Sequence, residues 1–201
     1  MSKMSKKKVI GITGSMGSGK SEISRYLRKK YPVLDCDQVN ADLLKKGNLG
    51  YQKLNDLHIV ELDSNGEIIK ESLASYTFSN IEHRKQVEAI LHPLIFDEMH
   101  KWIHEQESLI VFVEMPILFE ISAQEHFDSI WCVVADLDVA LSRLQTYRNF
   151  TREQALARLV SQMNPEEKMA KSDIVLRNNS TVEQLHMQIE DALKEEKLNG
   201  D

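Results

Sequence analysis

An apolar run that leads into a glycine-rich loop constrains the fold of this chain more than any other stretch. Residues 9–21 read Val-Ile-Gly-Ile-Thr-Gly-Ser-Met-Gly-Ser-Gly-Lys-Ser, and a helical pattern through Ile23 and Leu27 follows. The part from Gly14 to Ser21 matches the pattern G-x-x-x-x-G-K-[ST], in which backbone amides surround phosphate oxygens. We therefore predict a buried strand, a phosphate-binding loop and a helix whose N-terminus points at the bound phosphates.

The residues of this loop have different predicted roles in holding a nucleoside triphosphate. The glycines allow the backbone to curl tightly, so that successive N–H groups face one concave site. Lys20 is expected to reach the β- and γ-phosphates, and the Ser21 hydroxyl is expected to bind Mg²⁺. The predicted nucleotide-binding residues of the loop are Gly14, Ser15, Met16, Gly17, Ser18, Gly19, Lys20 and Ser21.

Composition argues against several function classes. The chain has 201 residues, of which 28% are charged and 42% hydrophobic, as in an ordinary globular protein. Its net charge of −6 argues against general affinity for nucleic acid. No segment approaches the roughly 18 apolar residues of a membrane helix, and the apolar run after the basic start is too short for a signal peptide. Cys36 and Cys132 form no C-x-x-C pattern, which favours a reducing compartment. We therefore expect a cytoplasmic protein that binds neither nucleic acid nor membranes.

Buried-type strands alternate with helical segments along most of the chain. Besides the strand before the loop, strands are predicted at residues 32–37, 109–114, 130–136 and 174–176. This alternation predicts an α/β fold in which a parallel sheet is covered by helices on both faces. Residues 40–104 are instead mostly helical, which predicts a helical lobe inserted into that core. Pro93 is expected to begin or kink a helix there.

Acidic residues end two of the predicted strands. In open parallel sheets ligands bind beyond the carboxyl ends of the strands, so these carboxylates are candidates for chemistry. Asp35 and Asp37 end one strand, and we assign Asp37 to the cap of the next helix and Asp35 to the site. Glu114 ends another strand, where it is expected to hold Mg²⁺ through water or to orient the acceptor.

The spacing of polar residues predicts where two later helices begin. Thr151 to Gln154 has the spacing of a capping box, in which the side chain of each of the two residues accepts a hydrogen bond from the backbone amide of the other. Ser180 to Glu183 has the same spacing before the last helix.

A phosphate-binding loop, an inserted helical lobe and a later arginine-bearing segment together are typical of a small kinase with a lid. The N-K-x-D pattern of guanine recognition is absent, and the D-x-x-G at residues 63–66 lies in a polar turn with no strand before it. Arg148 stands at the predicted start of the lid, where it and Lys20 would offset the charge of the transferred phosphoryl group. Asp35 would accept the proton of the acceptor hydroxyl.

Motifs in order along nearly the whole chain resemble those of the dephospho-CoA kinase family. They are the loop at 14–21, Val-Leu-Asp-Cys-Asp at 33–37, Phe-Ser-Asn at 78–80, His-Pro-Leu-Ile at 92–95, Glu-Met-Pro-Ile-Leu-Phe-Glu at 114–120, Arg143 with Arg148, residues 162–168 and residues 173–178. The resemblance implies ATP-dependent phosphorylation of the ribose 3′-hydroxyl of dephospho-coenzyme A, with Mg²⁺ as cofactor. The protein would be a monomer or a small homo-oligomer.

The resemblance also implies three parts and their site residues. The nucleotide-binding core would comprise residues 1–38, 105–147 and 170–201, the helical coenzyme-A-binding lobe residues 39–104, and the lid residues 148–169. Asp35 is implied as the base, in agreement with the independent reading of the strand ends. Further residues implied at the two substrate sites are Arg143 and Asn178 for ATP, with Asn178 near the adenine, and His92, Pro93, Glu114, Leu118 and Phe119 for the acceptor.

Four positions depart from the pattern of the family. They are Ala41 in place of an arginine or histidine, Lys70 in place of a frequent arginine, Asn149 in place of an aspartate and Ser180 in place of a glycine. The first two put in doubt how the phosphates of the acceptor are held, because a lysine cannot make the bidentate contact of an arginine.

Two other functions remain open on the sequence alone. The first is a small kinase for another acceptor, such as a nucleoside monophosphate or a sugar-like acid. The second is a non-catalytic module that uses ATP as a switch. Lys20, Ser21 and Asp35 together favour catalysis, because a switch needs no acceptor base.

Overall fold

The computed structural model describes residues 7–198, which form two compact units. One unit contains the chain up to Leu34 together with the chain from Gln106 onward, and the other contains Asp35–Glu105. The extreme ends, residues 1–6 and 199–201, lie outside the described residues. The first unit carries the phosphate-binding loop, and the second carries His92 and Pro93.

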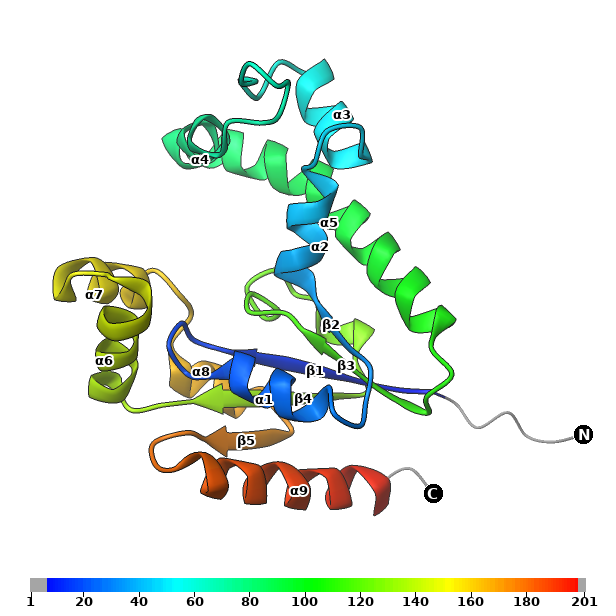
Figure 1. The fold of residues 1–201 in the computed structure, drawn as a ribbon, viewed down its shortest axis with the longest axis vertical. Helices are drawn as coiled ribbons and strands as arrows, with labels where there is room; N and C mark the ends of the chain where they lie inside the picture. The colour runs from blue at the N-terminus through cyan, green and yellow to red at the C-terminus, as the bar shows by residue number, and fades with distance from the viewer. Residues whose placement is uncertain (1–6, 199–201) are drawn as a thin grey trace, which may run out of the picture. The chain divides into compact units, whose positions relative to one another are not determined.

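The first unit contains both strands and helices, and the second unit is mainly helical (Figure 1). The strands are β1 (Lys8–Gly14), β2 (Val33–Asp35), β3 (Ile110–Glu114), β4 (Ser129–Val134) and β5 (Ile174–Arg177). The helices are α1 (Lys20–Leu27), α2 (Cys36–Leu43), α3 (Leu49–Asp56), α4 (Lys70–Ser79), α5 (Ile81–Glu105), α6 (Leu137–Arg148), α7 (Arg152–Val160), α8 (Pro165–Ala170) and α9 (Val182–Leu198), with a 3₁₀ turn η1 (Gln124–His126).

The predicted parallel α/β sheet is confirmed. Its strand order is β2-β3-β1-β4-β5, with β1 in the middle, and helices flank it (Figure 1). β1 pairs in parallel with β3 and β4, so that Ile12 lies beside Glu114 and Thr13 beside Cys132. The carboxyl ends of these strands therefore meet at one edge of the sheet, where the loop after β1 also begins.

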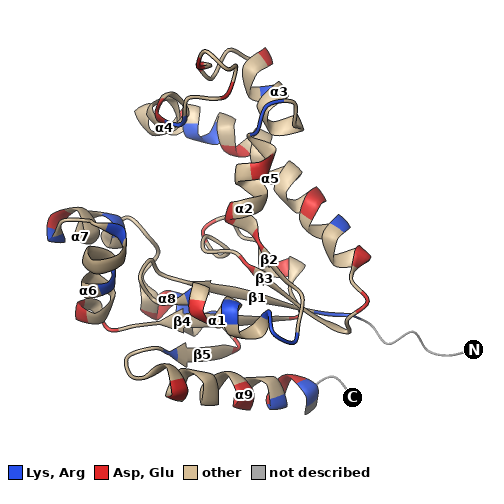
Figure 2. Cartoon of the chain, viewed as in Figure 1, with Lys and Arg blue, Asp and Glu red and all other residues tan. Residues whose placement is uncertain are grey.

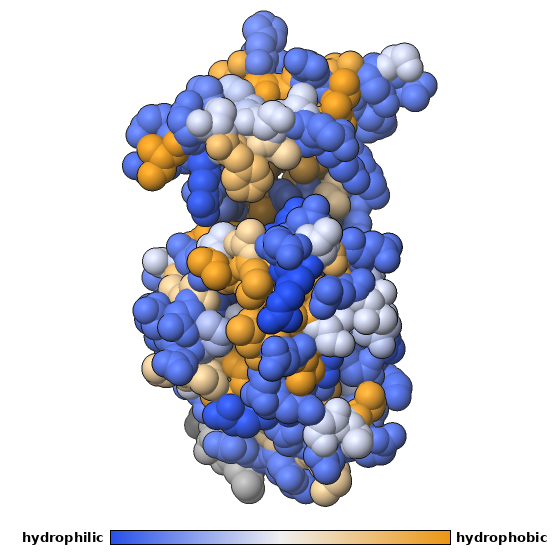
Figure 3. Space-filling model, turned by 90° about the vertical axis from the view of Figure 1, so that its left-hand side faces the viewer, coloured by the Kyte–Doolittle hydropathy of each residue, from blue (hydrophilic) through white to orange (hydrophobic). Residues whose placement is uncertain are grey.

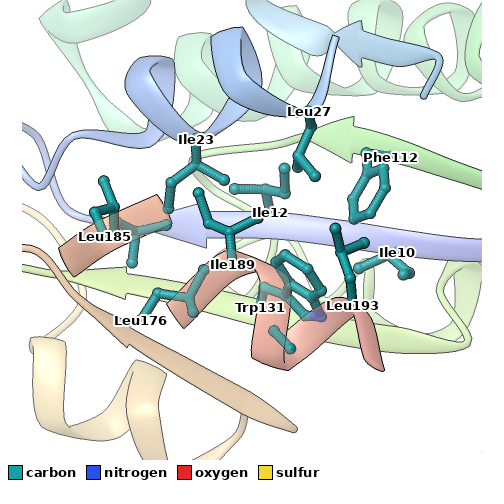
Figure 4. Packing of buried hydrophobic residues seen from close by; sticks show 12 residues of the cluster. Ile10, Ile12, Ile23, Leu27, Phe112, Trp131, Leu176, Leu185, Ile189 and Leu193 are labelled. Atoms are coloured by element: carbon teal, nitrogen blue, oxygen red, sulfur yellow. The ribbon is translucent and has the colours of Figure 1, made fainter. Parts of the chain in front are cut away.

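Alternation along β1 explains how the sheet is packed. Ile10 and Ile12 are fully buried in the cluster shown in Figure 4, together with residues of α1, α9 and the neighbouring strands. Between them, Gly11 leaves room for other side chains, because a Cβ there would lie 2.8 Å from Leu118 and 3.0 Å from Phe127. Side chains of a strand point alternately to its two faces, so β1 contacts apolar side chains on both. A strand covered on both faces is the pattern expected for a parallel sheet.

The helical unit has its own small core. Leu54, Ile59, Val87 and Leu91 are buried together, and these residues come from α3, α5 and the segment after α3. The mostly helical pattern predicted for residues 40–104 is confirmed in α2–α5. Pro93 lies inside the continuous helix α5, so it does not begin a helix. The chain between α3 and α4 contains the predicted polar turn.

Two caps differ from the predicted ones. α2 begins at Cys36, and its N-cap is Asp35, whose carboxylate accepts hydrogen bonds from the amides of Asp37 and Gln38. The assignment of the cap to Asp37 was therefore wrong, because the strand ends at Asp35, two residues earlier than predicted, and the helix begins at the next residue. At α9 the bond runs from the Gln184 amide to the Thr181 hydroxyl, one residue later than predicted.

Charged residues and hydrophobic residues are both spread over several elements (Figures 2 and 3). Acidic and basic residues both occur along α9 and on the α6–α7 segment (Figure 2). Hydrophilic residues cover most of the face shown in Figure 3, with hydrophobic patches between them. Among residues 7–198, no helix combines the length and the apolarity that crossing a membrane would need.

Candidate functional site

The loop between β1 and α1 has the backbone shape that a phosphate-binding loop needs. Gly14 and Gly19 have φ angles of +147° and +99°, in the region that side chains disfavour. A Cβ at Gly14 would lie 2.2 Å from the carbonyl oxygen of Val133, and one at Gly19 would lie 2.0 Å from the side-chain nitrogen of Asn178. Both glycines are therefore required by their neighbours as well as by their own conformation.

The N-terminus of α1 has no capping side chain, since its N-cap is Gly19. Unpaired amides at such a helix end attract anions. The ammonium of Lys20 donates to the carbonyl oxygens of Gly14 (2.8 Å) and Ser15 (3.1 Å), and so lies against the loop. Ser21 is exposed in the first turn of the helix. This arrangement can bind phosphate oxygens with backbone amides and one ammonium group.

Arg143 of α6 and Asn178, directly after β5, hold the loop from the side of its last residues. The guanidinium of Arg143 donates to the Asn178 backbone oxygen (3.0 Å) and side-chain oxygen (3.2 Å), and at 3.4 Å to the carbonyls of Gly17 and Ser18. The Asn178 amide donates to the Ser18 carbonyl at 2.9 Å. The structure thus brings together the loop and both residues predicted at the ATP site, and it shows that they fix the loop's shape.

The segment after α7 holds the loop at Met16. The Met16 amide donates to the side-chain oxygen of Gln162 at 2.9 Å, and Met16 also packs against the apolar cluster of Leu141, Leu144 and Ala155. A cavity of about 390 Å³ lies here, lined by the loop and by residues of α6, α7 and the segment that leads into α8. The C-terminal part of the predicted lid segment is therefore hydrogen-bonded to the phosphate-binding loop.

Arg148 is the last residue of α6 and is exposed. The next residue, Asn149, caps the helix with φ 55° and ψ 28°, the left-handed conformation that asparagine tolerates better than most residues. The predicted capping box follows and is confirmed in full, with Thr151 and Gln154 each bonded to the other's backbone amide. The chain therefore turns sharply between α6 and α7, with Arg148 at the turn.

Glu114 lies at the carboxyl end of β3, as predicted, and is 9% exposed. Its carboxylate accepts a hydrogen bond of 2.5 Å from the hydroxyl of Ser24 on α1. Burying a carboxylate is costly unless it accepts hydrogen bonds, and Ser24 supplies one. The bond therefore ties the acidic strand end to the helix that follows the loop.

Leu118 and Phe119 lie in the turn after β3 and are buried, with exposed fractions of 0% and 3%. The side chain of Leu118 fills the space over Gly11. A contact of either residue with the acceptor stays a prediction.

Asp35 has one carboxylate oxygen in the cap of α2. Both cap bonds, from the amides of Asp37 (2.9 Å) and Gln38 (3.3 Å), go to Oδ1. The cap therefore fixes the orientation of the carboxyl group. Neither of the two cap bonds involves Oδ2. The neighbouring Cys36 is buried, and so is Cys132.

His92 is half-buried in α5, and Pro93 beside it is exposed. Burial lowers the pKa of His92 below its ordinary value, the charge of Arg84 lowers it further, and the carboxylate of Glu88 opposes both. The neutral imidazole is thus favoured, a form in which one ring nitrogen accepts a hydrogen bond and the other donates one.

Three residues of the site were missed by the sequence analysis. Ser24 donates to Glu114, and Gln162 accepts from the amide of Met16. Thr13 donates to the carbonyl of Pro116 at 3.1 Å. Each bond joins segments far apart in the chain, and a serine on a helix or a glutamine after one carries no local signal of such a partner.

The described residues contain no group of three or more histidine, cysteine, aspartate or glutamate side chains that could hold a metal ion. Mg²⁺ in nucleotide sites needs no such group, because it keeps several waters and binds phosphate oxygens and one or two protein ligands. The exposed hydroxyl of Ser21 in the first turn of α1 fits that kind of site.

Comparison with known proteins identifies relatives over almost the whole chain. The sequence model of a family described as "Dephospho-CoA kinase" matches residues 8–184. The Dephospho-CoA kinase of Bacillus cereus is 34% identical over 192 residues, which cover 92% of this chain and 96% of the relative. That of Streptococcus mutans is also 34% identical, over 93% of this chain and 96% of the relative.

Two solved structures have the same fold. The crystal structure of TT1252 from Thermus thermophilus superposes with a TM-score of 0.83 at 32% identity, and the match covers 94% of this chain and 98% of that one. Dephospho-CoA kinase from Campylobacter jejuni superposes with a TM-score of 0.69 over 97% of this chain and 100% of that one. At 23% identity, this second likeness concerns the fold alone.

Proposed function

The chain belongs to the dephospho-CoA kinase family, and we propose that its loop at residues 14–21 holds the ATP whose γ-phosphoryl group passes to the ribose 3′-hydroxyl of dephospho-coenzyme A. The chain is a kinase, and its reaction is the ATP-dependent phosphorylation of dephospho-coenzyme A in coenzyme A biosynthesis. One observation carries this assignment: the family match runs from β1 into α9 without leaving out either unit.

In the proposed mechanism, the loop amides and Lys20 bind and neutralise the phosphates. Lys20 would exchange its present bonds to the carbonyls of Gly14 and Ser15 for bonds to the β- and γ-phosphates. Ser21 would hold Mg²⁺, which when bound would offset the negative charge of the transferring phosphoryl group. Glu114, fixed by Ser24, would orient the acceptor or bind a water of the metal. Catalysis of this kind consists mainly of positioning and charge neutralisation.

Asp35 is proposed as the base that accepts the proton of the acceptor hydroxyl. The cap bonds hold its carboxyl group in one orientation, which supports this role because a general base must be positioned before it can act. Residues 148–169 are proposed to act as a lid, and Arg148 at its start is proposed to offset the negative charge of the transferred phosphoryl group. The exposure of Arg148 is consistent with a group whose partner is a substrate.

The acceptor is proposed to contact His92, Pro93, Leu118 and Phe119. The half-buried and neutral His92 supports a hydrogen bond to an uncharged group of the acceptor. We retain residues 39–104 as the acceptor-binding lobe, residues 148–169 as the lid and the remainder as the nucleotide-binding core. The proposed location is the cytoplasm, which the buried cysteines, with no disulfide between them, support. The oligomeric state is proposed to be a monomer or a small homo-oligomer.

A panel of acceptors tests the proposed function. ADP release is measured with dephospho-coenzyme A and, in parallel, with nucleoside monophosphates, shikimate and gluconate. We expect turnover with dephospho-coenzyme A alone. Turnover with another acceptor and none with dephospho-coenzyme A would replace this function with that of a different small kinase, and ATP binding without any turnover would favour a nucleotide switch.

A further inference from the structure

Lys168 of α8 is fully buried, with an exposed fraction of 0%. A lysine is buried at a high cost in free energy unless its charge is paired and its donors are used. Its ammonium donates to the carboxylate of Glu120 (2.8 Å) and to the carbonyl oxygen of Pro116 (2.9 Å). Both partners lie in the turn after β3, which also contains Leu118 and Phe119.

The same turn is bonded to two other parts of the site. The Pro116 carbonyl also accepts from the hydroxyl of Thr13, the residue directly before the phosphate-binding loop. The Glu120 carboxylate also accepts from the amide of Met163 at 3.4 Å. Met163 follows Gln162, which bonds to Met16 of the loop. The turn at residues 116–120 is therefore bonded both to the residue before the phosphate-binding loop and to the C-terminal part of the proposed lid. Lys168 contacts this turn at both of its ends.

We propose that Lys168 is a positioning residue that holds the 116–120 turn in the shape required for binding the acceptor. Lys168 need not touch either substrate, because its two bonds fix the turn at Pro116 and at Glu120. The inference rests on the proposed acceptor role of Leu118 and Phe119. The phosphate-binding loop is held by other bonds, those of Arg143, Asn178 and Gln162. Loss of the lysine should therefore weaken binding of the acceptor more than binding of ATP.

The test is a steady-state comparison of Lys168→Met with the natural enzyme, with a measured midpoint of thermal unfolding for each. We expect the KM for dephospho-coenzyme A to rise about tenfold or more, and the KM for ATP to change less than about threefold. A purely structural role would reduce the amount of folded enzyme, and so kcat, and would leave both KM values unchanged. That result, or unchanged kinetics, would overturn the proposal. Failure of the natural enzyme to use dephospho-coenzyme A would instead contradict the proposed function.

A second variant keeps the test valid if Lys168→Met leaves Glu120 buried without its partner and the protein unfolds. In Lys168→Met with Glu120→Gln both charges are removed, so we expect stability to recover. The Pro116 carbonyl still lacks its lysine donor, and the raised KM for the acceptor should persist. Recovery of that KM along with stability would show that charge balance alone matters, contrary to the proposal. Lys171→Met, which removes an exposed lysine near the end of the same helix, is the matched control and should leave both KM values unchanged.

Discussion

The side-chain amide of Asn178 occupies the space in which any side chain at Gly19 would have to lie. Its nitrogen is 2.0 Å from the position of an added Cβ at Gly19, and it donates to the carbonyl of the preceding residue, Ser18. The glycine before the lysine of the loop is therefore needed twice, for a left-handed backbone and for the approach of a residue that lies after the last strand.

Gly19→Ala should be more destabilising than a substitution with the same backbone strain in open space. Gly47 provides that comparison, because its φ is +89° and nothing lies within 4 Å of its added Cβ. We expect Gly47→Ala to lower the free energy of unfolding by about 1–2 kcal/mol, and Gly19→Ala to lower it by about 1–3 kcal/mol more, with weaker ATP binding. Urea unfolding and ATP titration of both variants measure this, and equal losses would contradict the role of Asn178.

Asp35→Asn should separate the cap from the chemistry. Asparagine caps helices about as well as aspartate, so the free energy of unfolding should change by less than about 0.5 kcal/mol. The loss of the carboxylate should lower turnover by roughly a hundredfold or more, with ATP binding retained. Asp37→Asn, which changes an exposed carboxylate in the first turn of the same helix, is the control and should keep turnover within about twofold of the natural enzyme. Near-normal turnover of Asp35→Asn would remove Asp35 from the mechanism.

His92 should make the protein less stable in mild acid. Its pKa is lower in the folded protein than in the unfolded chain, where the pKa of histidine is about 6.5, so below that pH the unfolded chain binds more protons. The contribution of the neutral side chain is complete above the unfolded pKa and decreases as the pH falls toward the folded pKa. Urea unfolding at neutral and mildly acidic pH should therefore show a smaller loss of stability for His92→Gln than for the natural protein. An equal loss in both proteins would be evidence against this effect.

Local patterns made the loop and the alternation of strands and helices predictable. The pattern at Gly14–Ser21 indicates a phosphate-binding loop without reference to any distant residue. The parallel sheet follows from buried strands separated by helices. The cap of α2 was misplaced because β2 ends at Asp35 and α2 begins at the next residue, so strand and cap share one aspartate.

Contacts between distant segments were not predictable in the same way. Lys168 stands in the short helix Pro-Glu-Glu-Lys-Met-Ala, whose charges suggest exposure, yet the turn after β3 buries it. Arg143 and Asn178 were placed at the ATP site by resemblance, and only the structure shows that they hold the loop carbonyls. Tertiary hydrogen bonds of this kind leave no periodic trace in a single sequence.

The most direct measurement of the central claim follows both products of one reaction. The natural enzyme and its Lys20→Ala variant are incubated with ATP, Mg²⁺ and dephospho-coenzyme A, and ADP and the mass of the acceptor are followed together. We expect the natural enzyme to form ADP and coenzyme A in equal amounts, with the new phosphate on the ribose 3′-hydroxyl, and the Lys20→Ala variant to lose at least about a hundredfold in rate. ADP formed without phosphorylated acceptor, or a Lys20→Ala variant as active as the natural enzyme, would contradict phosphoryl transfer from this loop.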